Sequence, residues 1–304
     1  MIDIRRILCP VDFSDFSRRA LDHAIAIARW YESSVTALHV FSPAPVAAYG
    51  PGPVVFEPIV LTAVDRDQLL ADTNAFIEAE AAPGVAIDAV VREGNPAAEI
   101  VDQATGMNAD LLVIGTHGRS GFERLLLGSV AEKVLRKARC PVLTVPRRLP
   151  DAVPTAPVVF KRIICALDFS ECSMEALKYA LSLAQEADGC LILVHVVAPD
   201  FVGPVGLGEE HLSLVAYQRQ REEEARRLLA RAVPEMAGDY CKTETMLLRG
   251  KPGREILRIA SDRRAELIVM GVQGRGAADL LFFGSTTQHV VREASCPVLT
   301  LRGK

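Results

Sequence analysis

A glycine-rich stretch with a fixed spacing is the part of this sequence best suited to chemistry. From Gly115 to Ser129 the chain reads Gly-x2-Gly-x9-Gly-Ser. The apolar run Leu111–Ile114 before it is typical of a buried strand, and the pattern of Val130–Ala138 after it is typical of a helix. Because a helix start offers free backbone N–H groups and the positive end of the helix dipole, the stretch is suited to binding a phosphate.

The same spacing occurs a second time. Its second copy runs from Gly271 to Ser285, displaced by 156 residues. One glycine pattern is weak support for a binding site, whereas two copies at one offset are much stronger. The segment Asp12-Phe-Ser14 recurs at the same offset as Asp168-Phe-Ser170. The unbroken offset indicates a duplicated domain rather than a short structural repeat.

Strands and helices are expected to alternate within each repeat. The expected strands are nearly continuous apolar runs, which is typical of parallel β-α units with both sheet faces covered. In the first repeat they are Ile4–Val11, Ser34–Phe41, Val85–Arg92, Leu111–Ile114 and Cys140–Val145. Helices are expected after Ser14, over Asp65–Ala82, after Pro96 and over Val130–Ala138, and the Pro- and Gly-rich segment Ser42–Pro58 is expected to be a long loop.

Two domains are expected along the 304 residues. The segment Pro146–Phe160 carries four prolines and is typical of a linker. We therefore expect a first domain at residues 1–146, a linker at 147–160 and a second domain at 161–304.

Composition excludes several classes of protein. Half of the residues are hydrophobic and 24% are charged, which is typical of a globular protein. The net charge of −4, without a basic block, argues against nucleic acid as a partner. Prolines break the longest uncharged run, Ser33–Phe56, and the apolar run at the start of the chain is too short for a signal peptide, so we expect no membrane partner and a cytoplasmic protein.

An acidic residue follows the first expected strand of each repeat, at Asp12 and Asp168. In doubly wound sheets, ligands bind outside the carboxyl ends of the strands where the strand order reverses, and strands one and four would flank that point. Asp12 and the Gly115 stretch should therefore share one crevice, where a carboxylate could accept hydrogen bonds from a base or a ribose. The alternative is that Asp12 caps the helix beginning near Ser14.

With these residues the chain resembles the universal stress protein family. The resemblance covers both repeats, hence nearly the whole chain, and the Gly-x2-Gly-x9-Gly-Ser spacing is similar to the ATP-binding motif of that family. It implies an α/β fold with two doubly wound, five-stranded parallel sheets of strand order 3-2-1-4-5, of the Rossmann-like kind that binds adenine nucleotides. It also implies a tandem, ATP-binding and stress-related protein.

The resemblance further implies which residues hold the nucleotide. Adenine would contact Asp12 and Val40, with Pro10 and Val11 beside it. Ribose and phosphates would lie along Gly115, His117 and Gly118, and phosphate would be held by Gly128, Ser129 and Val130. The matching positions of the second repeat are Ala166, Leu167, Asp168, Val196, Gly271, Gln273, Gly274, Gly284, Ser285 and Thr286.

The repeats are not identical at these positions. Pro10 becomes Ala166, His117 becomes Gln273, and Ser120-Gly121 becomes Gly276-Ala277. An arginine follows the second glycine in both copies, at Arg119 and Arg275. Either arginine could pair with phosphates or could be an ordinary exposed loop residue.

Catalytic motifs are not found. The sequence lacks Gly-x4-Gly-Lys-Ser/Thr, Gly-x-Gly-x-x-Gly, Gly-x-Ser-x-Gly and His-Glu-x-x-His. No carboxylate pair suggests a base with a water, so any ATP hydrolysis should be slow. We expect a nucleotide-responsive ATP-binding protein in which Mg²⁺ could accompany the phosphates. The alternatives are a slow ATPase or nucleotidyl-transfer enzyme, a nucleotide-free interaction module, and, last, a phosphoacceptor domain using Asp12.

Other residues are assigned structural roles. The seven cysteines include no Cys-x-x-Cys pair and are expected to be small buried hydrophobes in a reducing compartment. His39 and His195 are expected to be core histidines with satisfied hydrogen bonds. The i,i+4 pairs of Glu222 with Arg226 and Glu223 with Arg227 are expected on a solvated helix face.

The fifth strand of each repeat has the features of an interface. Cys140–Val145 and Cys296–Leu301 are apolar and uncharged, and with strand order 3-2-1-4-5 each would be an exposed edge. Pairing the two strands within one chain would cover both edges. Universal stress protein domains resemble this arrangement, since single-domain members pair through that strand, and a homodimer of tandem chains is a further expectation. No particular protein partner is indicated.

Overall fold

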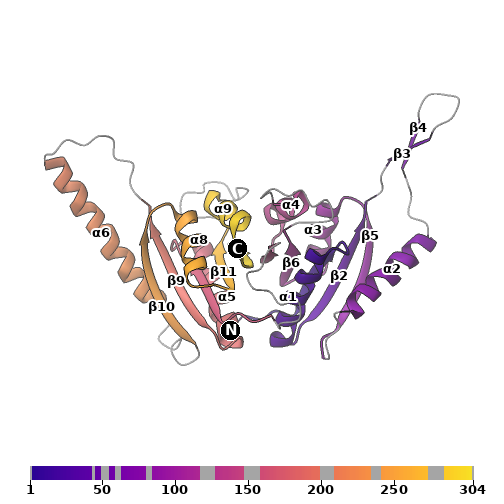
Figure 1. Ribbon diagram of the computed structural model, residues 1–304, viewed down its shortest axis with the longest axis horizontal. Coiled ribbons are helices and arrows are strands. Elements are labelled where there is room, and N and C mark those ends of the chain that lie inside the picture. The colour runs from indigo at the N-terminus through magenta and orange to yellow at the C-terminus, as the bar shows by residue number, and fades with distance from the viewer. Residues whose placement is uncertain are drawn as a thin grey trace. The chain divides into compact units, whose positions relative to one another are not determined.

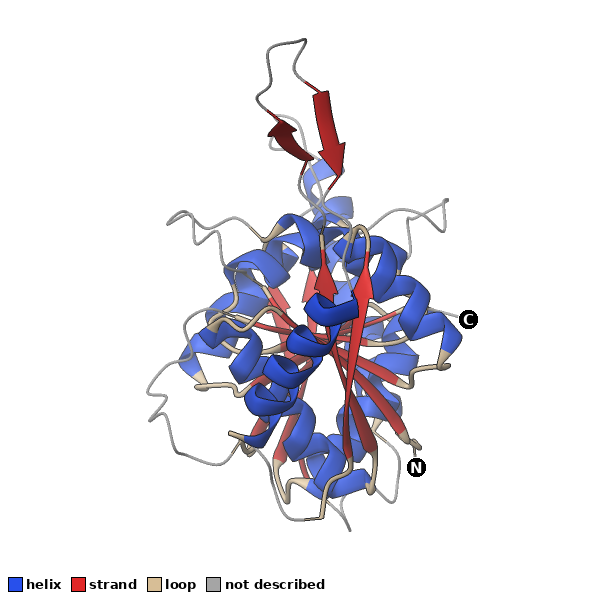
Figure 2. Ribbon diagram, turned by 90° about the vertical axis from the view of Figure 1, so that its right-hand side faces the viewer, coloured by secondary structure: helices blue, strands red, loops and turns tan. Residues whose placement is uncertain are grey.

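The computed structural model describes residues 2–42, 45–48, 55–58, 63–79, 84–116, 127–146, 158–198, 209–233, 241–272 and 284–302. The chain divides into two compact units, Asp3–Arg147 (unit 1) and Arg148–Lys304 (unit 2) (Figure 1). Helices flank the strands on both sides of the sheet (Figure 2). None of the described helices is long and apolar enough to cross a membrane.

Unit 1 alternates strands and helices as expected. Its elements are β1 (Arg6–Val11), α1 (Asp15–Tyr31), β2 (Ser34–Phe41), β3 (Pro45–Ala48), β4 (Val55–Pro58), α2 (Ala63–Glu78), β5 (Ile87–Glu93), α3 (Pro96–Gly106), β6 (Leu111–Gly115), α4 (Ser129–Lys137) and β7 (Val142–Val145). Apart from β3 and β4, the strands of this unit pair in parallel in the order β5-β2-β1-β6-β7. Counted within the repeat, this is the expected order 3-2-1-4-5, and it reverses between β1 and β6.

Unit 2 repeats this plan. Its elements are β8 (Arg162–Ala166), α5 (Glu171–Glu186), β9 (Cys190–Val197), α6 (Glu209–Ala232), β10 (Lys242–Arg249), α8 (Pro252–Asp262), β11 (Leu267–Gly271), α9 (Ser285–Glu293) and β12 (Val298–Leu301). The strands pair in parallel in the order β10-β9-β8-β11-β12, again 3-2-1-4-5. The α/β fold class is thus confirmed for both units.

The central strands are buried on both faces, which explains their continuous apolar runs. Ile7 and Leu8 of β1 and Leu112 and Val113 of β6 each have no exposed surface. Residues of one strand point alternately to the two faces, so neighbouring apolar residues are required where helices cover both. Burial of such side chains is the main favourable term of folding, at about 25 cal/mol per Å² of apolar surface.

The segment Ser42–Pro58 is not one long loop, and the expectation of a loop is wrong. β3 and β4 lie within it and form an antiparallel pair. The segment is rich in proline, but Pro45 and Pro58 face each other at the end of this short ladder. A missing N–H group is tolerated at a ladder end, so the prolines do not prevent pairing.

Two residues of unit 2 also differ from the sequence expectations. Phe160, placed in the linker, is 1% exposed and belongs to the core. Glu222, placed on a solvated helix face, is only 7% exposed and accepts hydrogen bonds from Arg249 of β10, with a shortest N–O distance of 2.5 Å. The i,i+4 spacing to Arg226 concealed this longer-range ion pair, which ties α6 to the edge strand.

The cysteines are free thiols, and five of the seven are buried, as expected. Cys140 and Cys190 are half-buried. Burial raises the pKa of the Cys140 thiol to about 11 and that of Cys296 to about 12. Burial also raises the pKa of Cys9 and Cys165, which lie in the central strands β1 and β8. These thiols stay protonated at neutral pH and pack as small apolar groups.

One buried histidine makes unit 1 sensitive to acid. His23 of α1 is 5% exposed, and its Nδ1 lies 2.7 Å from the carbonyl oxygen of Arg19, to which it donates. Burial lowers the pKa of His23 to about 4, because a charged ring would lose its hydration.

We expect the free energy of unfolding to fall between pH 6.5 and pH 4 because of the His23 side chain. In that window the unfolded chain binds a proton at His23 and the folded chain does not, so the contribution is fully present above pH 6.5 and is lost as pH falls towards 4. The loss should reach on the order of 3 kcal/mol. Urea unfolding of wild-type protein and His23→Gln at pH 7 and pH 4.5 tests this, and an identical pH dependence of the two proteins would contradict it.

Candidate functional site

A cavity of about 330 Å³ lies at the carboxyl ends of the central strands of unit 1. It is lined by the ends of β1 and β6, by β2, and by the first residues of α3 and α4. This is the point where the strand order reverses, the usual ligand position in doubly wound sheets. The expected site residues that line it are Pro10, Val11, Asp12, Val40, Gly115, Gly128, Ser129 and Val130.

Unit 2 has the corresponding cavity, of about 380 Å³. The expected site residues that line it are Ala166, Leu167, Asp168, Val196, Gly271, Gly284, Ser285 and Thr286. Six further candidates lie outside the described residues, namely His117, Gly118, Arg119, Gln273, Gly274 and Arg275. All of the described candidates of a unit therefore come together around one cavity.

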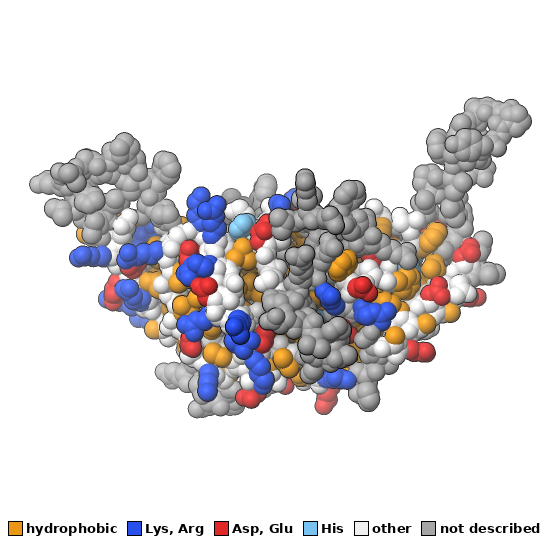
Figure 3. All heavy atoms as spheres, in the orientation of Figure 1, with side chains coloured by type: hydrophobic (Ala, Val, Ile, Leu, Met, Phe, Trp, Pro, Cys, Tyr) orange, Lys and Arg blue, Asp and Glu red, His pale blue; other side chains and the backbone are white. Residues whose placement is uncertain are grey.

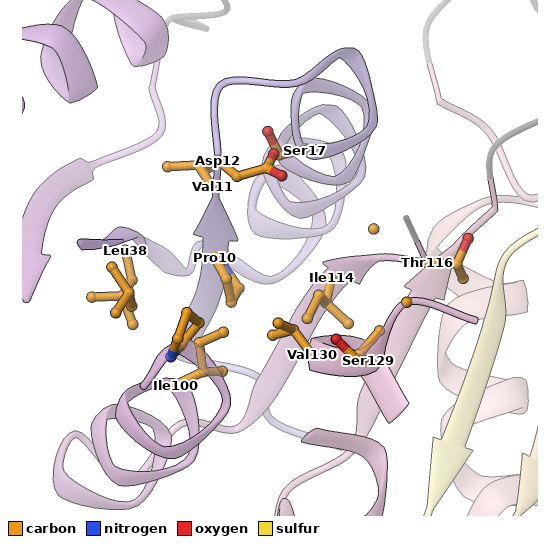
Figure 4. Close-up of a pocket in the computed structure, with 15 residues that line it drawn as sticks. Pro10, Val11, Asp12, Ser17, Leu38, Ile100, Ile114, Thr116, Ser129 and Val130 are labelled. Atoms are coloured by element: carbon orange, nitrogen blue, oxygen red, sulfur yellow. The ribbon is translucent and has the colours of Figure 1, made fainter. Parts of the chain in front are cut away.

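Sequence reasoning missed several residues of the cavity wall. In unit 1 these include Ser17 of α1, Leu38 of β2, Pro96 and Ile100 of α3, and Ile114 of β6. A signal for two of them was present, since Pro96 and Ile100 recur as Pro252 and Ile256 at the common offset. Figure 4 shows the polar groups of Asp12 and Ser17 together at one end, Ser129 at the other, and Ile114 between them.

Asp12 braces the start of α1 rather than capping it. The cap is Ser14, whose hydroxyl accepts a hydrogen bond from the N–H of Ser17 at 3.2 Å. Asp12 Oδ1 in turn accepts hydrogen bonds from the Ser14 N–H at 3.1 Å and the Ser14 hydroxyl at 2.5 Å. Asp168 and Ser170 repeat this arrangement at 3.0 and 2.5 Å. The turn thus fixes each carboxylate at the cavity wall.

The residue inside this turn has an unusual backbone conformation. Phe13 and Phe169 have φ angles of 63° and 62°, in the left-handed region that side chains of this size rarely adopt. Such a conformation costs roughly 1–2 kcal/mol. The Phe13 ring stacks on His39 with centroids 4.4 Å apart, and Phe169 lies 4.7 Å from His195. Stacking on a fixed ring offsets the backbone cost and holds the turn.

His39 is a core residue, as expected, whereas its counterpart His195 is only half-buried. His39 is 8% exposed, and its Nδ1 lies 2.9 Å from the carbonyl oxygen of Val11, to which it donates. His195 makes the same bond to Leu167 at 2.7 Å. Because Val11 and Leu167 line the cavities, the histidines help to fix the strand ends and act through them.

The helices that begin at the glycine motif differ from α1, α3 and α5, which also border the cavities. α1, α5 and α3 are capped by the side chains of Ser14, Ser170 and Asn95. α4 and α9 begin after Gly128 and Gly284, and neither receives a side-chain cap. Their first N–H groups therefore remain available to a ligand in the cavity.

A close approach at Gly271 completes the cavity of unit 2. A Cβ atom on Gly271 would lie 2.9 Å from Cys172 Cβ and 3.0 Å from the Ser173 nitrogen. Only glycine lets the start of α5 pack directly on the end of β11. Within the described ranges, no cluster of three or more His, Cys, Asp or Glu side chains could hold a metal.

The fold and the two cavities define a duplicated, doubly wound α/β protein with a cavity at each reversal of strand order. A model of the universal stress protein family matches residues 3–146 and again residues 160–302. The chain therefore belongs to the universal stress protein family, as a tandem member.

Individual relatives agree with this assignment. A universal stress protein of Methanocaldococcus jannaschii is 40% identical over 144 residues, which are 46% of this chain and 81% of that protein. One from Mycolicibacterium smegmatis is 26% identical over 314 residues, covering 97% of this chain and 96% of its own. The crystal structure of a universal stress protein from Archaeoglobus fulgidus shares the fold, with a TM-score of 0.65 and 22% identity over 99% of this chain and 97% of that chain.

The bracing of the Asp12 turn predicts a measurable stability effect. Ser14→Ala removes both the cap of α1 and the hydroxyl donor to Asp12, and it should lower the free energy of unfolding by about 1 kcal/mol. Ser14→Thr keeps the hydroxyl and is the matched control. Denaturant titrations measure both, and equal losses in the two variants would show that the hydroxyl is not the cause.

Proposed function

We propose that each unit binds an adenine nucleotide, ATP in the first instance, in its cavity. The observation that carries the proposal is the start of α4 and α9 at Gly128 and Gly284, open to the cavity and without a side-chain cap. An uncapped helix start combines free N–H donors with the positive end of the dipole, which favours a phosphate group.

The rest of the cavity suits a base and a sugar. Its middle is apolar, with Leu38, Ile100 and Val130 among the lining residues, and its volume of about 330 Å³ lies in the range of ligand pockets. A planar base fits between such side chains. Asp12 offers a carboxylate at the wall, where it can accept hydrogen bonds from the base amino group or the ribose.

The function proposed is binding and response rather than rapid turnover. Among the described lining residues, the carboxylates of Asp12 and Asp168 hold the turns before α1 and α5, a structural role rather than that of a general base, so hydrolysis of ATP should be slow at most. Arg119 and Arg275 stay predicted phosphate partners, and Mg²⁺ could accompany the phosphates. A role in the stress response and a cytoplasmic location are part of the same proposal.

A charge placed at the helix start tests nucleotide binding without disturbing the fold. Ser129 is the first residue of α4, is exposed and lines the cavity. A glutamate at this position is favourable for the helix dipole, so Ser129→Glu should fold normally while it repels phosphate. ATP affinity of site 1 should fall at least tenfold by calorimetry, and Ser285→Glu should do the same at site 2.

The neutral variants Ser129→Gln and Ser285→Gln are the matched controls and should bind ATP much better than the glutamate variants. The wild-type stoichiometry should approach two nucleotides per chain. Unchanged affinity and stoichiometry in the double variant Ser129→Glu/Ser285→Glu would rule out this phosphate site, and nucleotide-free wild-type protein that binds no ATP would support an interaction module instead.

We also propose that the two units pair through β7 and β12. Within its own unit, each strand is hydrogen-bonded on one side only, β7 to β6 and β12 to β11. The sequences Val-Leu-Thr-Val and Val-Leu-Thr-Leu leave each strand uncharged. An apolar edge of this kind promotes association, and mutual pairing would satisfy both edges.

A fragment containing unit 2 tests the pairing. Residues 156–304 should self-associate as a homodimer or aggregate, because β12 lacks a partner strand. Leu299→Lys should reduce association, since a charge on an edge strand opposes pairing. Light scattering at several concentrations measures this, and a stable, soluble monomer at high concentration would refute the pairing.

A further inference from the structure

The turn between the third strand and the following helix borders the cavity in both units. Pro96 of α3 and Pro252 of α8 line the cavities. The turns share one backbone conformation, with φ of 146° at Gly94 and 141° at Gly250. A Cβ atom would lie 2.8 Å from the Glu99 carboxylate if built on Gly94 and 2.9 Å from Glu255 Cγ if built on Gly250, so the two turns also pack in the same way. A difference in charge between the two turns is therefore a difference at equivalent positions beside the two cavities.

The charges at this turn differ between the units. From residue 92 to residue 99, unit 1 carries one arginine and two glutamates, hence a net charge of −1. From residue 248 to residue 255, unit 2 carries two arginines, one lysine and one glutamate, hence a net charge of +2. A difference of three charges therefore separates the two cavity rims.

Ion pairs neutralise part of the rim in each unit. In unit 1, Arg92 pairs with Glu99 at 3.3 Å, which leaves Glu93. In unit 2, Arg249 pairs with the nearly buried Glu222 at 2.5 Å.

The acidic residue of the unit 2 rim is also paired, because Glu255 contacts Arg258 at 2.8 Å. This leaves Lys251 and Arg254, both exposed, and neither forms an ion pair within the part of the chain that the structure describes. Figure 3 shows Lys and Arg side chains gathered on the visible face of unit 2. A net acidic rim in unit 1 thus corresponds to a basic rim in unit 2.

The helix starts at this turn differ in the same direction. Asn95 caps α3, accepting a hydrogen bond from the Ala98 N–H at 3.3 Å. Lys251 occupies the same place before α8, and its side chain makes no capping bond. The positive end of α8 is therefore less neutralised than that of α3, and it adds to the two cationic side chains.

We propose that the cavity of unit 2 selects its ligand by negative charge, preferring a nucleoside triphosphate over a monophosphate, whereas the cavity of unit 1 discriminates much less. Lys251 and Arg254 are the residues that determine this specificity. The inference deepens the nucleotide-binding function proposed above and rests on it.

The size of the effect follows from screened electrostatics. Lys251 directly precedes the lining residue Pro252 and Arg254 stands two residues beyond it, so both backbone positions lie within about one Debye length, roughly 8 Å, of the cavity wall. ATP carries about two more negative charges than AMP. Two side chains acting on two extra charges should raise the preference for ATP about three- to tenfold at low salt, and less at high salt.

The experiment compares the sites one at a time in the full chain. Ser129→Glu reports on site 2, and Ser285→Glu reports on site 1. Calorimetry gives the dissociation constants of ATP and AMP without Mg²⁺ at 50 and 300 mM NaCl. The ratio of the AMP constant to the ATP constant should be three- to tenfold larger at site 2, and the excess should shrink at 300 mM NaCl.

Exchanging the rim residues tests their role. In the Ser129→Glu background, Lys251→Asn with Arg254→Ala installs the residues of unit 1. It should remove the excess preference of site 2 for ATP over AMP. In the Ser285→Glu background, Asn95→Lys with Ala98→Arg should create the same excess preference for ATP at site 1. Lys242→Asn removes an equal charge at the amino end of β10, the opposite end of the strand from the cavity, and is the control for Lys251→Asn.

The outcomes separate this inference from the function on which it rests. An equal ratio of the AMP to the ATP dissociation constant at the two sites would overturn the charge selectivity and leave nucleotide binding intact. So would a larger ratio at site 2 that the rim exchange leaves unchanged. Absence of nucleotide binding at both sites of the wild-type protein would overturn both.

Discussion

Backbone N–H groups at the start of a helix need a partner, and the protein supplies that partner differently at different helices. Ser14, Asn95 and Ser170 close three helix starts with their own side chains. Gly128 and Gly284 leave α4 and α9 open at the cavity. The strand order that reverses between β1 and β6, and between β8 and β11, brings these open ends to the same cavities as Asp12 and Asp168. The cavities and the function proposed for them depend on that contrast.

The features that could be predicted from the sequence have local causes. The cap at Ser14, the strand at Leu111–Gly115 and the helix start after Gly128 follow from residue type and spacing within a few positions. The duplication adds long-range information, because an unbroken offset requires one fold for both halves. Together these were sufficient for the α/β fold class, for Asp12 and Asp168 and for the glycine motifs, whereas Pro10, Val40 and their counterparts were implied by the resemblance to the universal stress protein family.

The features that could not be predicted depend on contacts between distant residues. Ser17, Leu38 and Ile100 line the cavity because three separate elements meet there. Glu222 is buried because Arg249, on another element, reaches it, although its near neighbours in sequence suggested a solvated face. The left-handed backbone of Phe13 has no signal in residue type, since glycine or asparagine is the usual choice for that conformation. The ring of His39, 26 positions further along the chain, stacks on Phe13 and stabilises this conformation.

The burial of His23 also has a consequence for how the two halves unfold. The equivalent position of unit 2 is Tyr179, which is half-buried and is not charged by acid. Protonation of His23 in mild acid should therefore weaken unit 1, and this position makes no such contribution in unit 2. Heating at neutral pH and heating near pH 5 should differ in cooperativity, with the single heat-capacity peak of a matched pair giving way to two separate transitions.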